Sequence, residues 1–397
     1  MGRVRVGLSG LVESGCASLR GLRVGAILNP TSVDEELRHA ADLLHAGAKL
    51  CALFGPEHGV RGDAQYLEEV HGAVDRRTGI AEHSLYGKEF ASLTPRDEDL
   101  AGLDALVFDI QDAGSRYYTY LATMGLAMQA AARRKLRFVV LDRPNPIGGR
   151  HVEGGIVRTG FESFVGLWPI SARHGLTAGE CARLLNMSPT LGGFGIGCEL
   201  LVEPLQGWTR GMRWRQTQLA WILPSPNMPG PETALVYPGM CLLEGTNLSE
   251  GRGTTRPFEI WGAPWLDGHA LAEALRAEKL PGVRFRPCSF IPTWDKHARV
   301  RCQGVQLHVT DAEAFRPVRT GVACIAVARA QEPRMFRWRT DAYEFVDKIP
   351  AIDLLAGSAD LRAGIEAGRS VGELCAAWDG ERADYLGRRE AALLYEE

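Results

Sequence analysis

Short apolar segments that alternate with helical patterns are the feature that most constrains the fold of this chain. Apolar runs that we expect to form strands begin at Arg23, Lys49, Asp104 and Arg137, and amphipathic helical patterns lie between them. Near-continuous apolar strands separated by helices are typical of a parallel sheet that is covered on both faces. The sequence therefore predicts an α/β fold with a parallel sheet in its N-terminal part.

Two of the expected helices carry start signals. Ser32 and Glu35 form a capping-box pattern ahead of a helical period that runs to Gly47, a residue type common at helix C-termini. Thr177 and Glu180 form a second capping box at the start of another helical period. The sequence thus predicts a helix that begins at each of these boxes.

Polar side chains follow the carboxyl end of each expected strand. They are Asn29, Glu57, Asp109, Gln111, Asp112, Asp142, Arg143 and Asn145. Parallel strands place their carboxyl ends along one edge, and open sheets of this kind bind ligands there. We therefore expect these side chains to converge on one crevice; the alternative is that each is an ordinary helix cap or turn former.

The second half of the chain has weaker periodicity. Residues 221–234 are rich in proline and are predicted to form an ordered loop, and residues 237–265 have the length and glycine content of a functional loop. The segment 298–311 has the pattern of a hairpin, and the C-terminus is helical. We predict two domains: one over 1–232 that contains the parallel sheet, and a smaller α+β domain over 233–397.

Composition argues against several classes of partner. The formal net charge of −3 provides no electrostatic reason to bind nucleic acid or an anionic membrane. The basic segment 334–340 is short, and we interpret it as a solvated face. No segment reaches the roughly 18 apolar residues of a membrane span, and no secretory signal is visible. We expect a cytoplasmic protein, secreted only if a leader was removed, that is a monomer or a homodimer.

Common cofactor and nucleophile motifs are absent. The chain has no Walker A motif and no G-x-G-x-x-G between a strand and a helix, so no cofactor is expected. The G-x-S-x-G match around Ser370 lies in a helical pattern with no histidine after it. The sequence has no H-E-x-x-H motif; a convergent metal site from His58, Asp109, Asp112 and His174 is left as an alternative.

Carboxylates at strand ends suit acid–base chemistry. Glu57 follows an apolar strand in the tight turn Gly-Pro-Glu-His-Gly, where partial desolvation would raise its pKa toward the range of a general acid. Glycoside hydrolysis needs such an acid and a second group at the anomeric carbon. Asp109 and Asp112 are the candidates for that second carboxylate.

Several long motifs resemble a single family. They are FGPEHGVRGD from Phe54, FDIQDAGSRYYTY from Phe108, PSPNMP from Pro224 and EGTNLSEGRGTTRPFE from Glu244. In this order, along about residues 5–395, they resemble the exo-β-N-acetylmuramidase family of the NamZ type. The resemblance implies that residues 1–232 form a Rossmann-like catalytic domain with a Rossmann-like parallel sheet, and that the smaller α+β domain over 233–397 closes the cleft between the two. It implies removal of terminal N-acetylmuramic acid from the non-reducing end of peptidoglycan fragments. It also implies Glu57 as the leading catalytic residue.

The remaining expected substrate contacts divide by chemistry. Arg61, Arg116, Arg143 and Arg252 are candidates to clamp the lactyl carboxylate of muramic acid, and Tyr118 is a candidate to stack on a sugar face. Further polar candidates are His58, Gln111, Asp142, Asn145, His174, Asn227, Asn247, Glu250 and Glu259. For each of them the alternative is a structural hydrogen bond in a cap or loop.

Two other functions compete with glycoside hydrolysis. One is a muropeptide-binding or sensing protein without turnover, and the other is a metal-dependent hydrolase. The absence of a visible export signal favours an intracellular role in cell-wall recycling, with a peptidoglycan-derived saccharide as partner.

Overall fold

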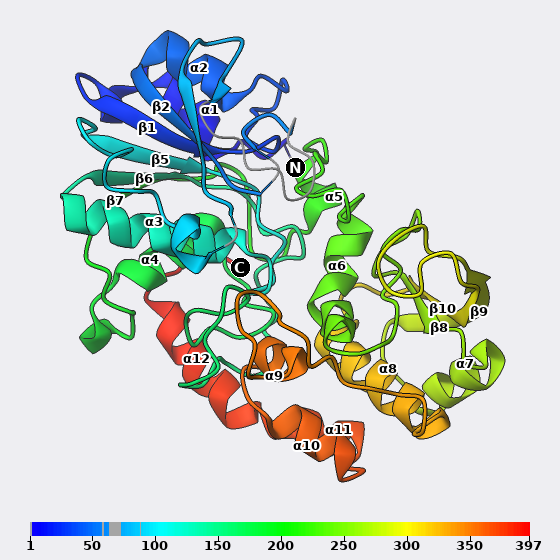
Figure 1. Ribbon diagram of the computed structural model, residues 1–397. Coiled ribbons are helices and arrows are strands. Elements are labelled where there is room, and N and C mark those ends of the chain that lie inside the picture. Colours follow the sequence, from blue (N-terminus) through cyan, green and yellow to red (C-terminus); the bar gives the residue numbers. More distant parts are fainter. Residues whose placement is uncertain (1, 58, 63–72, 88) are drawn as a thin grey trace.

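The computed structural model describes residues 2–57, 59–62, 73–87 and 89–397, and a large sheet lies at its N-terminal side (Figure 1). The strands of this sheet are β1 (Arg23–Leu28), β2 (Lys49–Gly55), β3 (Ala73–Val74), β4 (Ala81–Ser84), β5 (Ala105–Asp109), β6 (Arg137–Leu141) and β7 (Glu199–Glu203). Their order is β3-β4-β2-β1-β5-β6-β7, and all described neighbours are parallel except β3 and β4. The predicted α/β fold with a Rossmann-like parallel sheet is confirmed.

Helices cover both faces of this sheet (Figure 1). The helices α1 (Gly7–Glu13) and α2 (Ala40–Gly47) lie on one face, and α3 (Tyr120–Arg134) and α4 (Ala178–Asn186) lie on the other. Every residue of β5 is buried, because alternate side chains enter the core on opposite faces. This two-sided burial explains why the strands are near-continuous apolar runs in the sequence.

The first predicted helix start is wrong. The helix α2 begins only at Ala40, because the hydroxyl of Ser32 donates to the backbone carbonyl of Asp109 instead of capping a helix. The carboxylate of Asp34 accepts two backbone N–H groups of the following turn, at 3.0 and 2.8 Å, and Leu37 has a left-handed φ of 61°. A side chain that bonds its own turn in this way competes with helix formation. Contacts with the sheet thus override the local signal.

The C-terminal side of the chain carries a second, smaller sheet (Figure 1). Its antiparallel strands lie in the order β8 (Ile260–Ala263), β10 (Cys302–Val309) and β9 (Val283–Phe290). The helices that follow α4 along the chain are α5 (Trp214–Thr217), α6 (Pro231–Met240), α7 (Gly268–Ala277), α8 (Pro317–Gln331), α9 (Ala351–Ala356), α10 (Asp360–Glu366), α11 (Val371–Ala376) and α12 (Asp379–Glu390). Short 3₁₀ turns are η1 (Ala17–Leu19), η2 (Phe90–Leu93), η3 (Pro189–Leu191) and η4 (Cys241–Gly245). None of the helices in the described ranges is long and apolar enough to cross a bilayer.

Two segment predictions for this side need correction. The segment 298–311 does not form a hairpin by itself, because β10 is one continuous strand that pairs with β9 and β8. Residues 237–265 are not a plain loop, since they include the end of α6, the turn η4 and the strand β8. The proline-rich segment 221–234 is irregular up to Pro231, where α6 starts. Proline is tolerated at this first helical position because a backbone N–H there would have no acceptor within the helix.

The expected crevice at the edge of the large sheet is filled. The strand order reverses between β1 and β5, which is where open sheets usually bind ligands. Here Thr31, Gln111, Arg143 and Trp214 close around a space of only about 20 Å³. The strand-end side chains therefore meet in a packed interior at this point.

The last residues of the chain return to the large sheet. The hydroxyl of Tyr395 donates to the carboxylate of Asp142 at 2.5 Å, and the backbone N–H of Leu394 donates to Glu180 at 2.9 Å. The ring of Tyr395 also packs edge-on against Trp208. The C-terminal residues thus pack against the N-terminal part of the fold, which contains the large sheet. The division into domains at residue 232 stays a prediction.

The helices α6 and α8 approach each other so closely that only glycine fits. A Cβ atom at Gly239 would lie 1.8 Å from the carbonyl oxygen of Pro317. We predict that Gly239→Ala lowers the free energy of unfolding by about 3 kcal/mol in urea titrations, because backbone atoms must move. The control Gly387→Ala, in an open position of α12, should raise it by up to about 1 kcal/mol. Equal stability of Gly239→Ala and the wild type would contradict the proposed close packing.

Candidate active site

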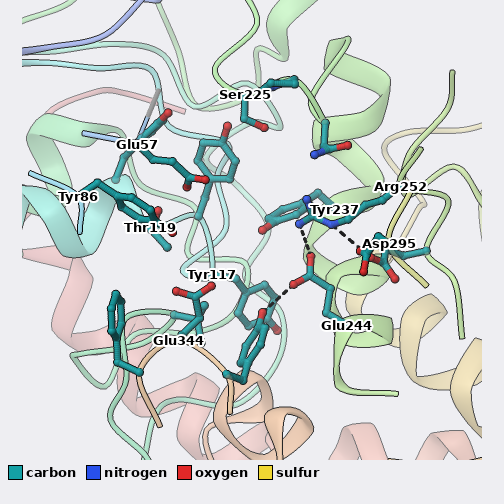
Figure 2. A pocket seen from close by; sticks show the side chains of 18 of the residues that line it. Glu57, Tyr86, Tyr117, Thr119, Ser225, Tyr237, Glu244, Arg252, Asp295 and Glu344 are labelled. Atoms are coloured by element: carbon teal, nitrogen blue, oxygen red, sulfur yellow. Dashed lines mark hydrogen bonds and ion pairs between the residues drawn. The ribbon is translucent and has the colours of Figure 1, made fainter. Parts of the chain in front are cut away.

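A cavity of about 880 Å³ lies between the turn after β2 and the C-terminal side of the chain (Figure 2). Its lining includes Glu57, Tyr86, Tyr118, Asn227, Tyr237, Glu244, Glu250, Arg252, Asp295, Arg339, Tyr343 and Glu344. Of the residues predicted from the sequence, it brings together Glu57, Tyr118, Asn227, Glu250 and Arg252. Carboxyl groups and aromatic rings dominate this lining, a combination suited to a polar ring-shaped ligand.

A tight turn places Glu57 at the cavity. The backbone N–H of Gly59 donates to the carbonyl of Pro56 at 3.0 Å, and Gly59 has a φ of 74° that favours glycine. A Cβ atom at Gly55 would lie 2.9 Å from the Cα atom of Gly59, so position 55 must also be glycine. The half-buried Glu57 points from this turn into the cavity (Figure 2), and its neighbour His58 lies outside the described residues.

The carboxylate of Asp109 forms an ion pair inside the protein. Its Oδ2 accepts a hydrogen bond from Nη2 of Arg143 at 2.9 Å, and Nε of the same guanidinium binds Oδ1. The side chains are 0% and 4% exposed, respectively. Neither residue lines the large cavity, contrary to the expectation that both reach a ligand crevice, because each satisfies the charge of the other in the core.

The carboxylate of Asp142 is also internal. It accepts hydrogen bonds from the hydroxyl of Thr177 at 2.8 Å and from the backbone N–H of Gly179 at 2.7 Å, besides the bond from Tyr395. Burial raises its pKa to about 6, although these donors oppose the shift. The predicted capping box of Thr177 and Glu180 is confirmed. Asp142 thus joins the end of β6 to the start of α4 and to the C-terminus.

Asp112 and His174 form a pair, and neither is part of the cavity lining. Nδ1 of His174 accepts the backbone N–H of Leu176 at 3.2 Å, so Nε2 carries the proton and donates to Oδ2 of Asp112 at 3.1 Å. The side-chain amide of Gln111 donates to two backbone carbonyls, and that of Asn145 donates to the carbonyl of Leu176. These four predicted site residues therefore make internal contacts.

The predicted arginine clamps are engaged by the protein itself. Arg61 pairs with Asp42 and Asp75, and it holds the pKa of Asp75 below its usual range against the opposing effect of burial. The buried Arg116 donates to the backbone carbonyls of Gly155, Ile170 and Leu355 at 2.6 to 2.7 Å. Neither guanidinium lines the cavity, and Arg252 is the predicted clamp that does.

Two further residues that were predicted to contact the substrate instead form hydrogen bonds that hold loops together. The side chain of Asn247 binds the backbone of Met335 and Arg337, each at 2.9 Å. Oε1 of Glu259 accepts the hydroxyl of Thr233 at 2.6 Å. Both are absent from the lining of the cavity.

Paired charges form one wall of the cavity (Figure 2). Arg252 contacts Glu244 at 2.6 Å and Glu250 at 3.2 Å, and the Lys296 ammonium contacts Glu250 at 2.9 Å. Burial by itself raises the pKa of Glu244, but the charge and hydrogen bond of Arg252 outweigh it and hold that pKa below the usual value. The hydroxyl of Tyr343 donates to the other oxygen of Glu244 at 2.7 Å. The wall is therefore rigid and nearly neutral.

Sequence reasoning missed four charged residues of the cavity lining, namely Glu244, Asp295, Arg339 and Glu344. Glu344 lies at the tip of a two-residue turn, and its sequence Tyr-Glu-Phe-Val lacks the Asn-Gly type that would reveal such a turn. Arg339 belongs to the basic segment interpreted as a solvated face, yet it lines the cavity with its guanidinium 4.9 Å from the ring centre of Tyr343. No local pattern distinguishes Arg339 from its exposed neighbours, because only the fold turns it inward.

Comparison with known proteins identifies the family. A model of the N-terminal part of exo-beta-N-acetylmuramidase NamZ matches residues 24–232, and a model of its C-terminal part matches residues 235–395. The chain belongs to this family. It is 43% identical over 395 residues to the peptidoglycan beta-N-acetylmuramidase NamZ of Bacillus subtilis (strain 168). The aligned region covers 99% of this chain and 92% of that protein.

Solved structures share the NamZ-family fold. A crystal structure of a DUF1343 family protein from Bacteroides fragilis NCTC 9343 has a TM-score of 0.89 and 37% identity, covering 99% of each chain. A second DUF1343 family protein of the same strain has a TM-score of 0.78 and 28% identity, covering 100% of each chain. The family resemblance inferred from the sequence motifs is confirmed.

The buried pair of Asp109 and Arg143 generates a stability prediction. Arg143→Met should lower the free energy of unfolding by about 3 to 5 kcal/mol, because it leaves a carboxylate buried without its cation. The double variant Asp109→Asn/Arg143→Met should recover most of this loss in urea titrations. The folded double variant should keep the wild-type turnover on the substrate of the proposed function below. Loss of turnover in a fully stable Asp109→Asn variant would instead indicate a direct catalytic role.

Proposed function

We propose that this chain is an exo-acting glycoside hydrolase that removes β-1,4-linked N-acetylmuramic acid from the non-reducing end of peptidoglycan fragments. The observation that carries this proposal is the position of Glu57 in a carboxyl-rich cavity of about 880 Å³, in a chain 43% identical to a peptidoglycan beta-N-acetylmuramidase. A cavity of this size accommodates a small ligand of one or two sugar rings. We further propose a role in cell-wall recycling, with a peptidoglycan-derived saccharide as substrate.

Glu57 is the proposed general acid. Its proton passes to the glycosidic oxygen while the bond from that oxygen to the anomeric carbon breaks, and water supplies the hydroxyl group of the new reducing end. The charge that develops on the sugar ring is positive, so the carboxyl groups around the cavity favour the transition state. The aromatic rings of Tyr118 and Tyr237, 5.7 Å apart and nearly perpendicular, provide an apolar surface for the sugar.

Arg339 is the proposed contact for the lactyl carboxylate of muramic acid. Arg252 is neutralised by Glu244 and Glu250, whereas no described carboxylate lies within ion-pairing distance of Arg339. The half-buried guanidinium of Arg339 rests on Tyr343, which limits its motion and leaves donors available. A cation of this kind distinguishes N-acetylmuramic acid from N-acetylglucosamine, which lacks the carboxylate.

Glu57→Gln tests the reaction. Because the amide cannot donate a catalytic proton, turnover of a MurNAc–GlcNAc disaccharide should fall about 100-fold or more, while ligand affinity is retained. With a 4-nitrophenyl N-acetylmuramide the loss should be smaller, since that leaving group needs little protonation. A wild type that binds the disaccharide without turnover would support the sensing alternative, and activity abolished by chelator and restored by a divalent ion would support the metal-dependent hydrolase.

Arg339→Gln tests substrate recognition. Loss of a charge-assisted hydrogen bond should raise KM for the 4-nitrophenyl N-acetylmuramide about tenfold with little change in kcat. The matched control Arg334→Gln changes an exposed arginine of the same segment and should leave both constants unchanged. An unchanged KM in Arg339→Gln would contradict this assignment.

The cytoplasmic location and the monomeric or homodimeric state are further proposals. Cell fractionation with an antibody to the native protein tests the location. Light scattering of the purified chain tests the oligomeric state.

A further inference from the structure

We propose that Glu344 is the second catalytic carboxyl of the cavity and that it acts as the general base. This inference rests on the proposed function, in which Glu57 is the general acid. Glu57 gives its proton to the leaving oxygen as the glycosidic bond breaks, the oxygen of a water molecule bonds to the anomeric carbon, and Glu344 takes the proton of that water. A proton then returns from Glu344 to Glu57 through solvent, so that one water is consumed for each bond broken.

The placement of carboxyl groups in the cavity carries the inference. In Figure 2 Glu57 and Glu344 point into the same part of the cavity, Glu57 from above and Glu344 from below. Of the other described carboxyls in the lining, Glu244 and Glu250 are neutralised by ion pairs, and Asp295 is exposed at the rim. Glu344 is half-buried and has no ion pair with a described residue, so its carboxyl is available to a ligand.

The backbone holds Glu344 in an unfavourable conformation. Glu344 and Phe345 have left-handed φ angles of 47° and 69° at the tip of a turn closed by Tyr343 and Val346, whose backbone groups bond each other at 2.8 and 3.0 Å. Turns of this type strongly prefer asparagine, aspartate or glycine. A charged residue at such a position is typical of a functional site, where strain is tolerated for correct placement.

Neighbouring side chains hold the turn in place on both sides of Glu344. Tyr343 is buried and donates to Glu244, which is fixed by Arg252. The ring of Phe345 contacts Phe90 and Phe164 edge-on, with ring centres 6.1 and 6.2 Å apart. The carboxyl of Glu344 therefore approaches the cavity from a fixed direction, as a catalytic group must.

The electrostatic environment of Glu344 suits a base. Burial, followed by the negative charges of Glu244 and Glu57, raises its pKa to about 7 against the opposing charges of Arg252 and Arg339. A base whose pKa lies near the working pH is strong enough to take a proton and still ionised in a useful fraction. Because only the ionised form accepts the proton, kcat/KM should fall as the pH drops below about 7.

The test uses three substitutions in the full chain. Glu344→Gln should lower kcat at least 100-fold on both the disaccharide and the 4-nitrophenyl N-acetylmuramide, because water activation is needed whatever the leaving group. Glu344→Asn should lose activity equally while the midpoint of thermal unfolding stays the same or rises, because asparagine tolerates the left-handed conformation. The matched control Asp347→Asn removes an exposed carboxylate just beyond the same turn and should leave kcat unchanged.

Two additional measurements separate catalysis from a structural role. The residual kcat/KM of Glu344→Gln should no longer fall on the acidic side of the pH profile. Azide should restore turnover of the 4-nitrophenyl N-acetylmuramide by Glu344→Ala, with a glycosyl azide as product. Near-wild-type kcat with an unchanged pH profile in Glu344→Gln would overturn the inference while leaving the proposed function intact. A wild type inactive on both substrates would overturn the proposed function itself.

Discussion

The cavity depends on the pairing of Arg252 with Glu244 and Glu250. These carboxylates lie in a desolvated wall, where unpaired charges would cost several kcal/mol each. Once neutralised, Glu244 accepts the hydroxyl of Tyr343 and so fixes the turn that carries Glu344. One guanidinium therefore links the local chemistry of the wall to the geometry of the proposed catalytic pair.

The large sheet acts mainly as a scaffold. Its strand order reverses between β1 and β5, but the ion pair of Asp109 and Arg143 and the packing around Trp214 fill the place where a ligand crevice usually forms. The ligand cavity instead lies beside the turn after β2, and the C-terminal part of the chain supplies its opposite wall. Of the polar groups at the strand ends, Asp109 and Arg143 thus stabilise the core, whereas Glu57 reaches the site.

Local sequence signals succeeded where the fold left them unopposed. The capping box of Thr177 and Glu180 forms as predicted, because the other partners of these side chains leave the capping atoms available. The Thr177 hydroxyl donates to Asp142 while its oxygen accepts the N–H of Glu180, and Leu394 binds the carboxylate oxygen of Glu180 that the box does not use. The equivalent pattern at Ser32 and Glu35 fails, because Ser32 bonds the end of β5 and Glu35 accepts from the N-terminal segment. A side-chain donor satisfies whichever acceptor the tertiary structure brings nearest, and the sequence does not reveal that competition.

By itself the sequence determined the parallel strands, the helices between them, the tight turn with Glu57 and the family, because apolar periodicity, glycine positions and long motifs are properties of neighbouring residues. Only the tertiary structure decided that Asp109, Asp112 and Asp142 make internal contacts while Glu344 and Arg339 face the cavity. The physical reason is that the role of a charged side chain depends on its desolvation and on the partner charges around it. Both are set by residues far away in the chain.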